Sequence, residues 1–415
     1  MGLAMAPDAA ITSDTKQFEL TNPVKLTCFA LCMAQVDILA MGAVQGAWFR
    51  DAAGQLYDFD FVNIWTAGQH VLNGNPAAAY DQTVHKAAQV AALGHDFAGF
   101  YPWCYPPTFL IPAALLALAP YISAYLIWVC LTFAAYLAVI RGIIGRNAGI
   151  LVACACPGVM MNISVGQNGF LSTALIGSAL LLMQRQPLVS GLLIGLLSFK
   201  PQFGILIPIA LMAGGHWKVF LAASLSTLAV NAASLFAFGT APWEAFFPTI
   251  QAISQATLTQ GLSDWHKLHS TYALVRLYGG SDTLAWALHG SVMAGSAVAI
   301  FGIWRSKVSF EIKAAALGVA TVLVTPYIFI YDLIILAVPM AFLLRVGINT
   351  GILPGEQTCL ALACLLILLY PFVPAPVGIS AVFLIVALIS RRIFADEFPW
   401  SRNPTIARET SASVA

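Results

Sequence analysis

The stretch YISAYLIWVCLTFAAYLAVI, Tyr121–Ile140, decides the fold, because its twenty residues include no charged side chain. A helix that crosses the hydrocarbon core of a bilayer needs about 20 mostly apolar residues. The whole chain has the same character, with 60% hydrophobic residues, 9% charged residues and a mean hydropathy of +0.83. These values lie outside the range of soluble domains. The chain is therefore predicted to be an all-α polytopic membrane protein.

Further apolar runs follow one another along the chain. Several are too short to cross a bilayer straight, so we expect broken helices at GQNG (Gly166–Gly169), KPQ (Lys200–Gln202) and TPY (Thr325–Tyr327). Broken helices inside a membrane normally line a cavity. About twelve spans are predicted. The segment Tyr105–Ala119 does not fit their alternation, so it is expected to be a re-entrant segment, a surface helix or a thirteenth span. The other runs are Lys25–Ala43, Ala148–Ile163, Gly169–Met183, Leu188–Phe199, Phe203–Met212, Val219–Phe238, Thr283–Trp304, Ala314–Val324, Leu333–Leu344, Thr358–Tyr370 and Val377–Ile389.

The positions of Lys and Arg predict the orientation, because cytoplasmic loops carry an excess of these residues. A consistent alternation places these basic residues and both termini inside: Lys16, Arg141, Arg146, Arg185, Lys218, Arg305, Lys307, Arg345, Arg391 and Arg392. Residues 1–23 and 396–415 are then cytoplasmic segments that flank a transmembrane domain, 24–395. Its first outer loop is 46–107 and its second outer segment is 241–280. Polar residues gather at the outer face: Asp58, Asp60, Gln167, Asn168, Lys200, Lys267, His269, Tyr331 and Asp332.

Charge and cysteine content exclude several classes of function. The formal net charge is +1 and no block of like charges occurs, so nothing indicates a nucleic-acid partner. The eight cysteines form neither a disulfide framework nor a zinc-binding spacing. The first twenty residues lack the layout of a cleavable signal peptide, so the first span is expected to remain as an anchor.

The first outer loop contains the stretch YDFDFVNIWTAG, Tyr57–Gly68, with its acids Asp58 and Asp60. Two amphipathic helices are predicted in this loop, over Asn63–Leu72 and Asp81–Leu93. A carboxylate within hydrogen-bond reach of a hydroxyl can act as its general base, and Asp60 is the favoured candidate. Two alternatives stay open. DFD matches a DxD motif that holds a divalent cation against a diphosphate, and Asp60 also suits the N-cap of a helix that starts near residue 61.

Seven stretches occur in a characteristic order along the chain: DFVNIWTAG, LNGNPAAAYD (Leu72–Asp81), YPP (Tyr105–Pro107), GQNGFL (Gly166–Leu171), GLLIGLLSFKPQ (Gly191–Gln202), KLHSTYALVRLYGG (Lys267–Gly280) and TPYIFIYDL (Thr325–Leu333). Together they resemble the bacterial family-87 membrane glycosyltransferases of the GT-C class, over nearly the whole sequence. The resemblance implies a GT-C-type bundle that takes a sugar from a polyprenyl-phosphate donor outside the cytoplasmic membrane, with an essential aspartate in the first outer loop. By position that aspartate is Asp60, whereas His269 stands where the family pattern has proline.

The matched positions receive substrate-binding roles under this resemblance. Lys200 supplies a compact charge to the lipid phosphate, unless it only extends toward the membrane surface. The amides of Gln167 and Asn168 suit sugar hydroxyls, with loop capping as the alternative. The other expected substrate contacts are Asp58, Lys267, His269, Tyr327, Tyr331 and Asp332. The aromatic residues Trp65, Trp103 and Tyr105 are assigned instead to the aromatic belt at the membrane interface.

The predicted activity is transfer of a single sugar by inverting displacement. Mannose is the first choice of sugar and arabinofuranose the second, and the acceptor is a glycolipid or glycan at the outer face of a bacterial cytoplasmic membrane. No cofactor is required, because phosphate is a good leaving group, and a divalent metal is not favoured. A lipid-linked-sugar transporter or flippase and an oligosaccharide ligase are the alternatives. We find no internal repeat of the kind that transporters usually show.

Overall fold

The computed structural model describes residues 22–397 except residues 49, 52, 146 and 374. Every named element in this part of the chain is a helix. Most of the two expected cytoplasmic segments, 1–23 and 396–415, lies outside the described residues, which include only 22–23 and 396–397 of them. Lys16 and Arg146 also lie outside the described residues. The division of the chain into these segments therefore stays a prediction.

All twelve apolar runs are helical in the structure, which confirms an all-α polytopic membrane protein. Six helices are long and apolar enough to cross a bilayer, and α6 with α7 makes a seventh span if this pair, bent by 66°, counts as one. The six are α1 (Asn22–Val44), α5 (Tyr121–Ile144), α11 (Trp217–Phe238), α14 (Asp282–Arg305), η7 (Ile330–Leu336) continued by α16 (Ala337–Thr350), and α18 (Val377–Glu397). The remaining runs form α6 (Ala148–Ala155), α7 (Gly158–Val165), α8 (Gly169–Leu182), α9 (Pro187–Leu196), α10 (Ile207–Ala213), α15 (Phe310–Leu323) and α17 (Glu356–Leu368).

The three predicted helix breaks are confirmed. The GQNG break separates α7 from α8, and the KPQ break lies between two short 3₁₀ turns, η3 (Leu197–Phe199) and η4 (Pro201–Gly204). The TPY break follows α15 and leads into η7. Glycine and proline explain the breaks, since Gly166 adopts a left-handed φ of 66° and Pro201 has no N–H to continue a helix.

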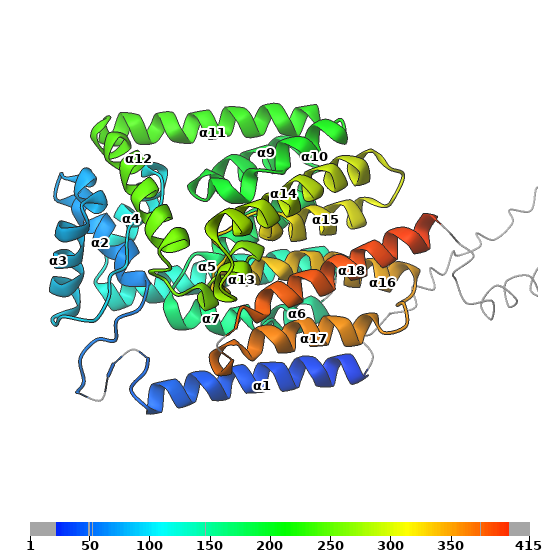
Figure 1. The fold of residues 1–415 in the computed structure, drawn as a ribbon, viewed down its shortest axis with the longest axis horizontal. Helices are drawn as coiled ribbons and strands as arrows, with labels where there is room; N and C mark the ends of the chain where they lie inside the picture. Colours follow the sequence, from blue (N-terminus) through cyan, green and yellow to red (C-terminus); the bar gives the residue numbers. More distant parts are fainter. Residues whose placement is uncertain (1–21, 49, 52, 146, 374, 398–415) are drawn as a thin grey trace, which may run out of the picture.

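The first outer loop folds into a cap of short helices at one end of the bundle (Figure 1). Its helices are α2 (Phe61–Leu72), η1 (Pro76–Tyr80) and α3 (Gln82–Leu93), and η2 (Pro107–Phe109) and α4 (Leu110–Ala117) follow directly after it. Both predicted amphipathic helices are present, but α2 is largely buried rather than lying on a surface. The unplaced segment Tyr105–Ala119 is not a span, because it forms η2 and the short helix α4, which packs against α2. That contact is close: a Cβ on Gly68 would lie 2.1 Å from the Ala113 carbonyl oxygen.

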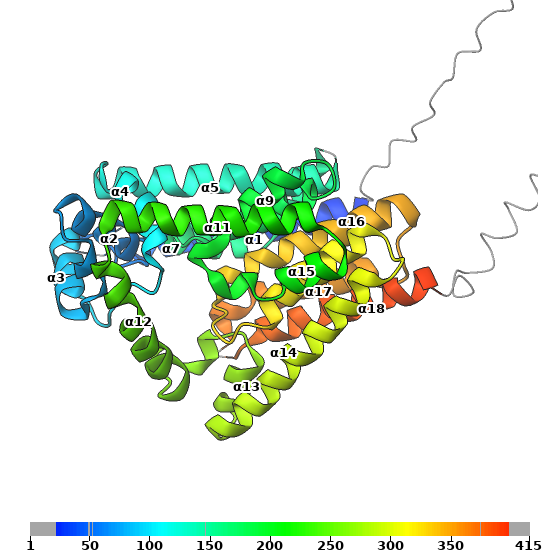
Figure 2. The same cartoon turned by 90° about the horizontal axis from the view of Figure 1, so that it is seen from above.

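The second outer segment is helical too, and Figure 2 shows it projecting from the side of the bundle. It contains α12 (Ala241–Ser254), the π-helical turn η5 (Gln255–Thr259), the 3₁₀ turn η6 (Trp265–Lys267) and α13 (Thr271–Leu277). A small core holds it together and joins it to the start of α14, built from Leu258, Leu268, Tyr272 and Ala273 of the segment and Ala285 of α14.

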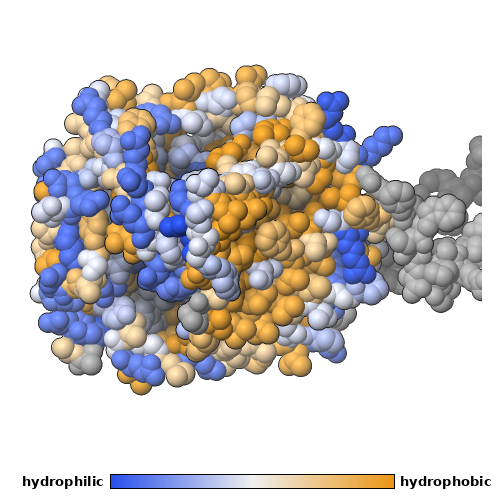
Figure 3. Space-filling view, viewed as in Figure 1, coloured by the Kyte–Doolittle hydropathy of each residue, from blue (hydrophilic) through white to orange (hydrophobic). Residues whose placement is uncertain are grey.

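The surface divides into zones along the long axis of the bundle. Hydrophilic side chains cover the end that carries α2, α3 and α12, which we call the polar end, and a broad hydrophobic zone follows it (Figure 3). The loop between α14 and α15 and the last turns of α18 lie at the opposite end (Figure 1). An apolar zone between two polar ends is what a bilayer requires of a multi-pass protein.

Candidate active site

Asp60 lies at the start of α2, between two aromatic anchors. Phe59 and Phe61 are buried and pack against the rings of Tyr121 and Tyr125, so the backbone on either side of Asp60 is held in place. Asp60 occupies the N-cap position, but its side chain makes no capping hydrogen bond. The N-cap interpretation therefore does not account for this carboxylate.

The Asp60 carboxylate instead accepts a hydrogen bond from the side chain of Gln167, with 2.7 Å between Oδ2 and Nε2. Burial raises the pKa of Asp60 to about 6, while the Gln167 hydrogen bond and the charge of Lys200 act in the opposite direction. Protein atoms surround the carboxyl group, yet part of the residue remains accessible. A carboxylate that is mostly enclosed by protein, still partly exposed and has a pKa near ambient pH is suited to taking a proton from a substrate.

The GQNG break presents Gln167 and Asn168 to this carboxylate. Glycine is required on both sides, because a Cβ on Gly166 would lie 2.7 Å from Phe61 and one on Gly169 would lie 2.5 Å from the Tyr331 carbonyl oxygen. The Asn168 side chain is fully buried, and neither its amide nitrogen nor its amide oxygen has a hydrogen-bond partner among the described residues.

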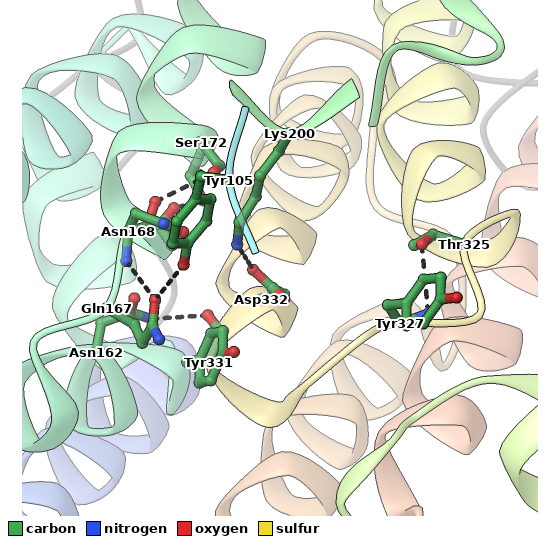
Figure 4. Close-up of polar contacts among 12 residues, drawn as sticks. Tyr105, Asn162, Gln167, Asn168, Ser172, Lys200, Thr325, Tyr327, Tyr331 and Asp332 are labelled. Carbon is green, nitrogen blue, oxygen red and sulfur yellow. Dashed lines mark hydrogen bonds and ion pairs between the residues drawn. The ribbon is translucent and has the colours of Figure 1, made fainter. Parts of the chain in front are cut away.

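Tyr105 belongs to the site, although the sequence assigned it to the interfacial aromatic belt. Its hydroxyl donates to Gln167 Oε1 at 3.1 Å (Figure 4), and its own carbonyl accepts from the Tyr80 hydroxyl at 2.9 Å. Tyr105 and Trp103 are 8% and 1% exposed, so the belt assignment is wrong for both. Burial raises the pKa of Tyr105 well above its usual value, and the nearby charges of Asp332 and Asp60 add to this effect.

Lys200 and Asp332 form a buried ion pair in the same region. Lys200 Nζ lies 2.6 Å from Asp332 Oδ1, and the two side chains are 6% and 3% exposed (Figure 4). The ammonium group also lies 5.5 Å from the ring centres of Tyr331 and Phe203. Lys200 therefore does not extend to the membrane surface, and that alternative for this residue is wrong.

Tyr331 lies beside this pair. Its carbonyl accepts a hydrogen bond from Asn162 Nδ2 at 2.8 Å, which ties η7 to α7, and its ring stacks on Phe329 with centroids 5.5 Å apart. The three helix breaks thus bring Gln167, Asn168, Lys200, Tyr331 and Asp332 together.

Other predicted site residues lie apart from this group. Tyr327 contacts the hydroxyl of Ser254 and lies away from Tyr331 in Figure 4. Lys267 is exposed and pairs with Asp264 at 3.2 Å. Their roles toward a substrate stay predictions.

His269 and Asp58 also have other surroundings than expected. His269 is buried, and its Nδ1 accepts from the backbone N–H of Gly378 at 3.1 Å. Burial lowers the pKa of His269 to about 4, so the ring is neutral and offers no charge to a phosphate. Asp58 is half-buried, and its carbonyl accepts from the Tyr101 hydroxyl at 3.0 Å.

The arrangement places a proton acceptor and a cationic side chain in the same region of the protein. Asp60 can accept a proton and Lys200 can attract an anion. Tyr105 contacts Gln167 beside Asp60, and the Tyr331 ring lies beside Lys200. Among the described residues, no group of three or more His, Cys, Asp or Glu side chains is placed to hold a metal ion.

Comparison with known protein families matches residues 103–326, more than half of the chain, to the model of Glycosyltransferase family 87. Comparisons with curated proteins and with solved structures give no match. The matched segment carries Tyr105, Gln167 and Lys200, whereas Asp60 precedes it and Asp332 follows it. The resemblance in the sequence motifs and the family match therefore agree, and the chain belongs to glycosyltransferase family 87.

Proposed function

We propose that this glycosyltransferase transfers one sugar, mannose as first choice, from a polyprenyl-phosphate donor to a hydroxyl of a glycolipid or glycan. The observation that carries the proposal is the buried, accessible Asp60 carboxylate within the electrostatic influence of Lys200. A hydroxyl needs a base when it attacks, and a departing phosphate needs a cation. The apolar zone of the protein suits a donor whose polyprenyl chain stays in the bilayer (Figure 3).

The proposed reaction is a single displacement. Asp60 takes the proton of the acceptor hydroxyl while the oxygen forms a bond to the anomeric carbon. The bond between that carbon and the phosphate oxygen breaks on the opposite face, and its electron pair leaves with polyprenyl phosphate. Configuration inverts, and Asp60, now protonated, returns its proton to water. No metal is needed for this step, since phosphate leaves readily.

Lys200 meets the donor phosphate in this proposal while it remains close to Asp332. An ammonium group has three N–H donors, and within the described part of the chain Lys200 makes one hydrogen bond, to Asp332. The remaining donors are available to a phosphate oxygen. Asp332 holds the ammonium group in place before the donor binds.

Product analysis tests this function. Purified protein is incubated with radiolabelled polyprenyl-phosphate mannose or arabinofuranose and with membrane lipid extract. We expect one labelled sugar to appear in a new glycosidic bond, together with free polyprenyl phosphate. Movement of label across a vesicle without a new bond would indicate a transporter, and transfer of a whole oligosaccharide would indicate a ligase.

The proposed location is the bacterial cytoplasmic membrane, with the polar end facing outward. In a background without native cysteines, Leu262→Cys is expected to react with an impermeant thiol reagent in intact cells, while Lys307→Cys reacts only after permeabilisation. Both positions are exposed, and the candidate span α14 separates them, since Leu262 precedes its first residue and Lys307 follows its last. Leu262 is chosen over its neighbour Gly261 as the labelling position, because the φ of 70° at Gly261 disfavours any side chain. The reverse labelling pattern would place the site in the cytoplasm.

A further inference from the structure

A chain of two hydrogen bonds ends at the Asp60 carboxylate. Tyr105 Oη donates to Gln167 Oε1 at 3.1 Å, and Gln167 Nε2 donates to Asp60 Oδ2 at 2.7 Å. The three residues come from three separate segments: the loop before η2, the GQNG break and the start of α2. We infer that Tyr105 and Gln167 position the Asp60 base, so that Gln167 serves the carboxylate rather than the sugar.

The polarity of the Gln167 amide is fixed by its neighbours. The backbone N–H of Asn168 also donates to Gln167 Oε1, at 3.3 Å. A backbone N–H can only donate, so the amide oxygen must face it and the amide nitrogen must face Asp60. The Tyr105 hydroxyl then adds a second donor to the same oxygen. Gln167 Oε1 is therefore already used twice, which leaves it poorly placed to accept from a sugar hydroxyl.

The consequence for Asp60 is that its two oxygens differ. Oδ2 is held by Gln167, whereas Oδ1 accepts no side-chain hydrogen bond among the described residues. Oδ1 is thus the oxygen left to receive a proton, at a position set by Gln167. This inference rests on the proposed function, in which Asp60 is the base.

The same hydrogen bond sets the pH range in which the base is ionised. Burial raises the pKa of Asp60 to about 6, and the donor from Gln167 counteracts that rise by stabilising the carboxylate. A hydrogen bond to a charged group is among the stronger hydrogen bonds in proteins. Loss of this donor is therefore expected to raise the pKa by about one unit or more.

Two variants test the inference. Gln167→Met keeps the length of the side chain and removes the amide, and Tyr105→Phe removes only the hydroxyl. We expect the acid limb of the kcat/KM profile for the acceptor to move up by about one pH unit in Gln167→Met and by a smaller amount in Tyr105→Phe. Turnover at pH 7 should fall about tenfold in Gln167→Met, about twofold from the lower ionised fraction of Asp60 and the rest from loss of its positioning, with the KM for the donor nearly unchanged. Matched controls are Gln251→Met and Tyr278→Phe, which alter exposed residues.

A second readout does not depend on activity. Infrared difference spectra can follow the Asp60 carboxyl band during a pH titration, with Asp60→Asn identifying the band. The titration midpoint should rise in both variants, and Tyr105→Phe keeps this test available if Gln167→Met does not fold. The inference would be overturned if either variant kept the wild-type acid limb of the kcat/KM profile and the wild-type titration midpoint. It would also be overturned if a raised KM for the donor were the only change. Full activity of Asp60→Asn would instead refute the proposed function.

Discussion

We expect Asp60→Asn to lower turnover by about 100-fold or more, the range usual for loss of a general base. Asparagine keeps the shape of the side chain but cannot take a proton. The neighbouring structure should survive, because Phe59 and Phe61 hold the backbone and the amide can still accept from Gln167. Turnover at saturating donor and acceptor measures the effect, and the thermal melting temperature reports folding.

Asp58→Asn is the matched control. The backbone carbonyl of Asp58, which accepts from the Tyr101 hydroxyl, is retained by the substitution, so turnover should change much less. Addition of a chelator should leave wild-type turnover unchanged. Equal losses in the two variants, together with inhibition by chelator, would favour a metal held by the DFD stretch and contradict the proposed mechanism.

The sequence predicts the helix breaks well because they depend on local chemistry. Gly166, with its left-handed φ, and Pro201, without an N–H, interrupt helices through their own backbone chemistry, and polar residues beside such breaks are candidates for a site. The position of Asp60 before a helix is equally local. These local features are sufficient to select Asp60, Gln167, Asn168 and Lys200 as candidate site residues.

The pairing within the site depends instead on tertiary structure. Gln167 meets Asp60 across 107 residues, and Lys200 meets Asp332 across 132 residues. No local pattern specifies either contact. Tyr105 was missed for a related reason: an aromatic residue beside two prolines near a membrane surface has the composition of an interfacial belt. Only the packing of α2, α4 and the GQNG break shows that it is buried.

The Lys200–Asp332 pair gives rise to the second large expected effect. From the sequence alone, Lys200→Gln would weaken donor binding and leave the yield of protein unchanged. The structure changes the second expectation, because Asp332 would remain as a buried, unpaired charge. Breaking a buried ion pair typically costs about 3–5 kcal/mol. Lys200→Gln and Lys200→Met should therefore both lower the melting temperature and the yield in detergent.

The double variant Lys200→Met, Asp332→Leu separates stability from donor binding. Replacing both members of a buried pair by apolar residues is often nearly neutral, so the double variant should recover most of the lost stability. Donor affinity should stay about 30-fold weaker, as expected for loss of a charge-assisted hydrogen bond worth about 2 kcal/mol. The apparent KM for the donor and the melting temperature are measured on the same preparations.

A second buried ion pair at the other end of the bundle provides the control. Arg392 bonds to Glu356 with side chains 4% and 3% exposed, and neither residue lies near Asp60. Arg392→Met alone should destabilise the protein, and Arg392→Met, Glu356→Leu should restore stability, with donor affinity at the wild-type value in both variants. If Lys200→Met, Asp332→Leu likewise restores both, then Lys200 is structural, and another cation must meet the departing phosphate. A stable double variant with weak donor binding assigns Lys200 to the phosphate, because burial of the pair no longer explains the loss.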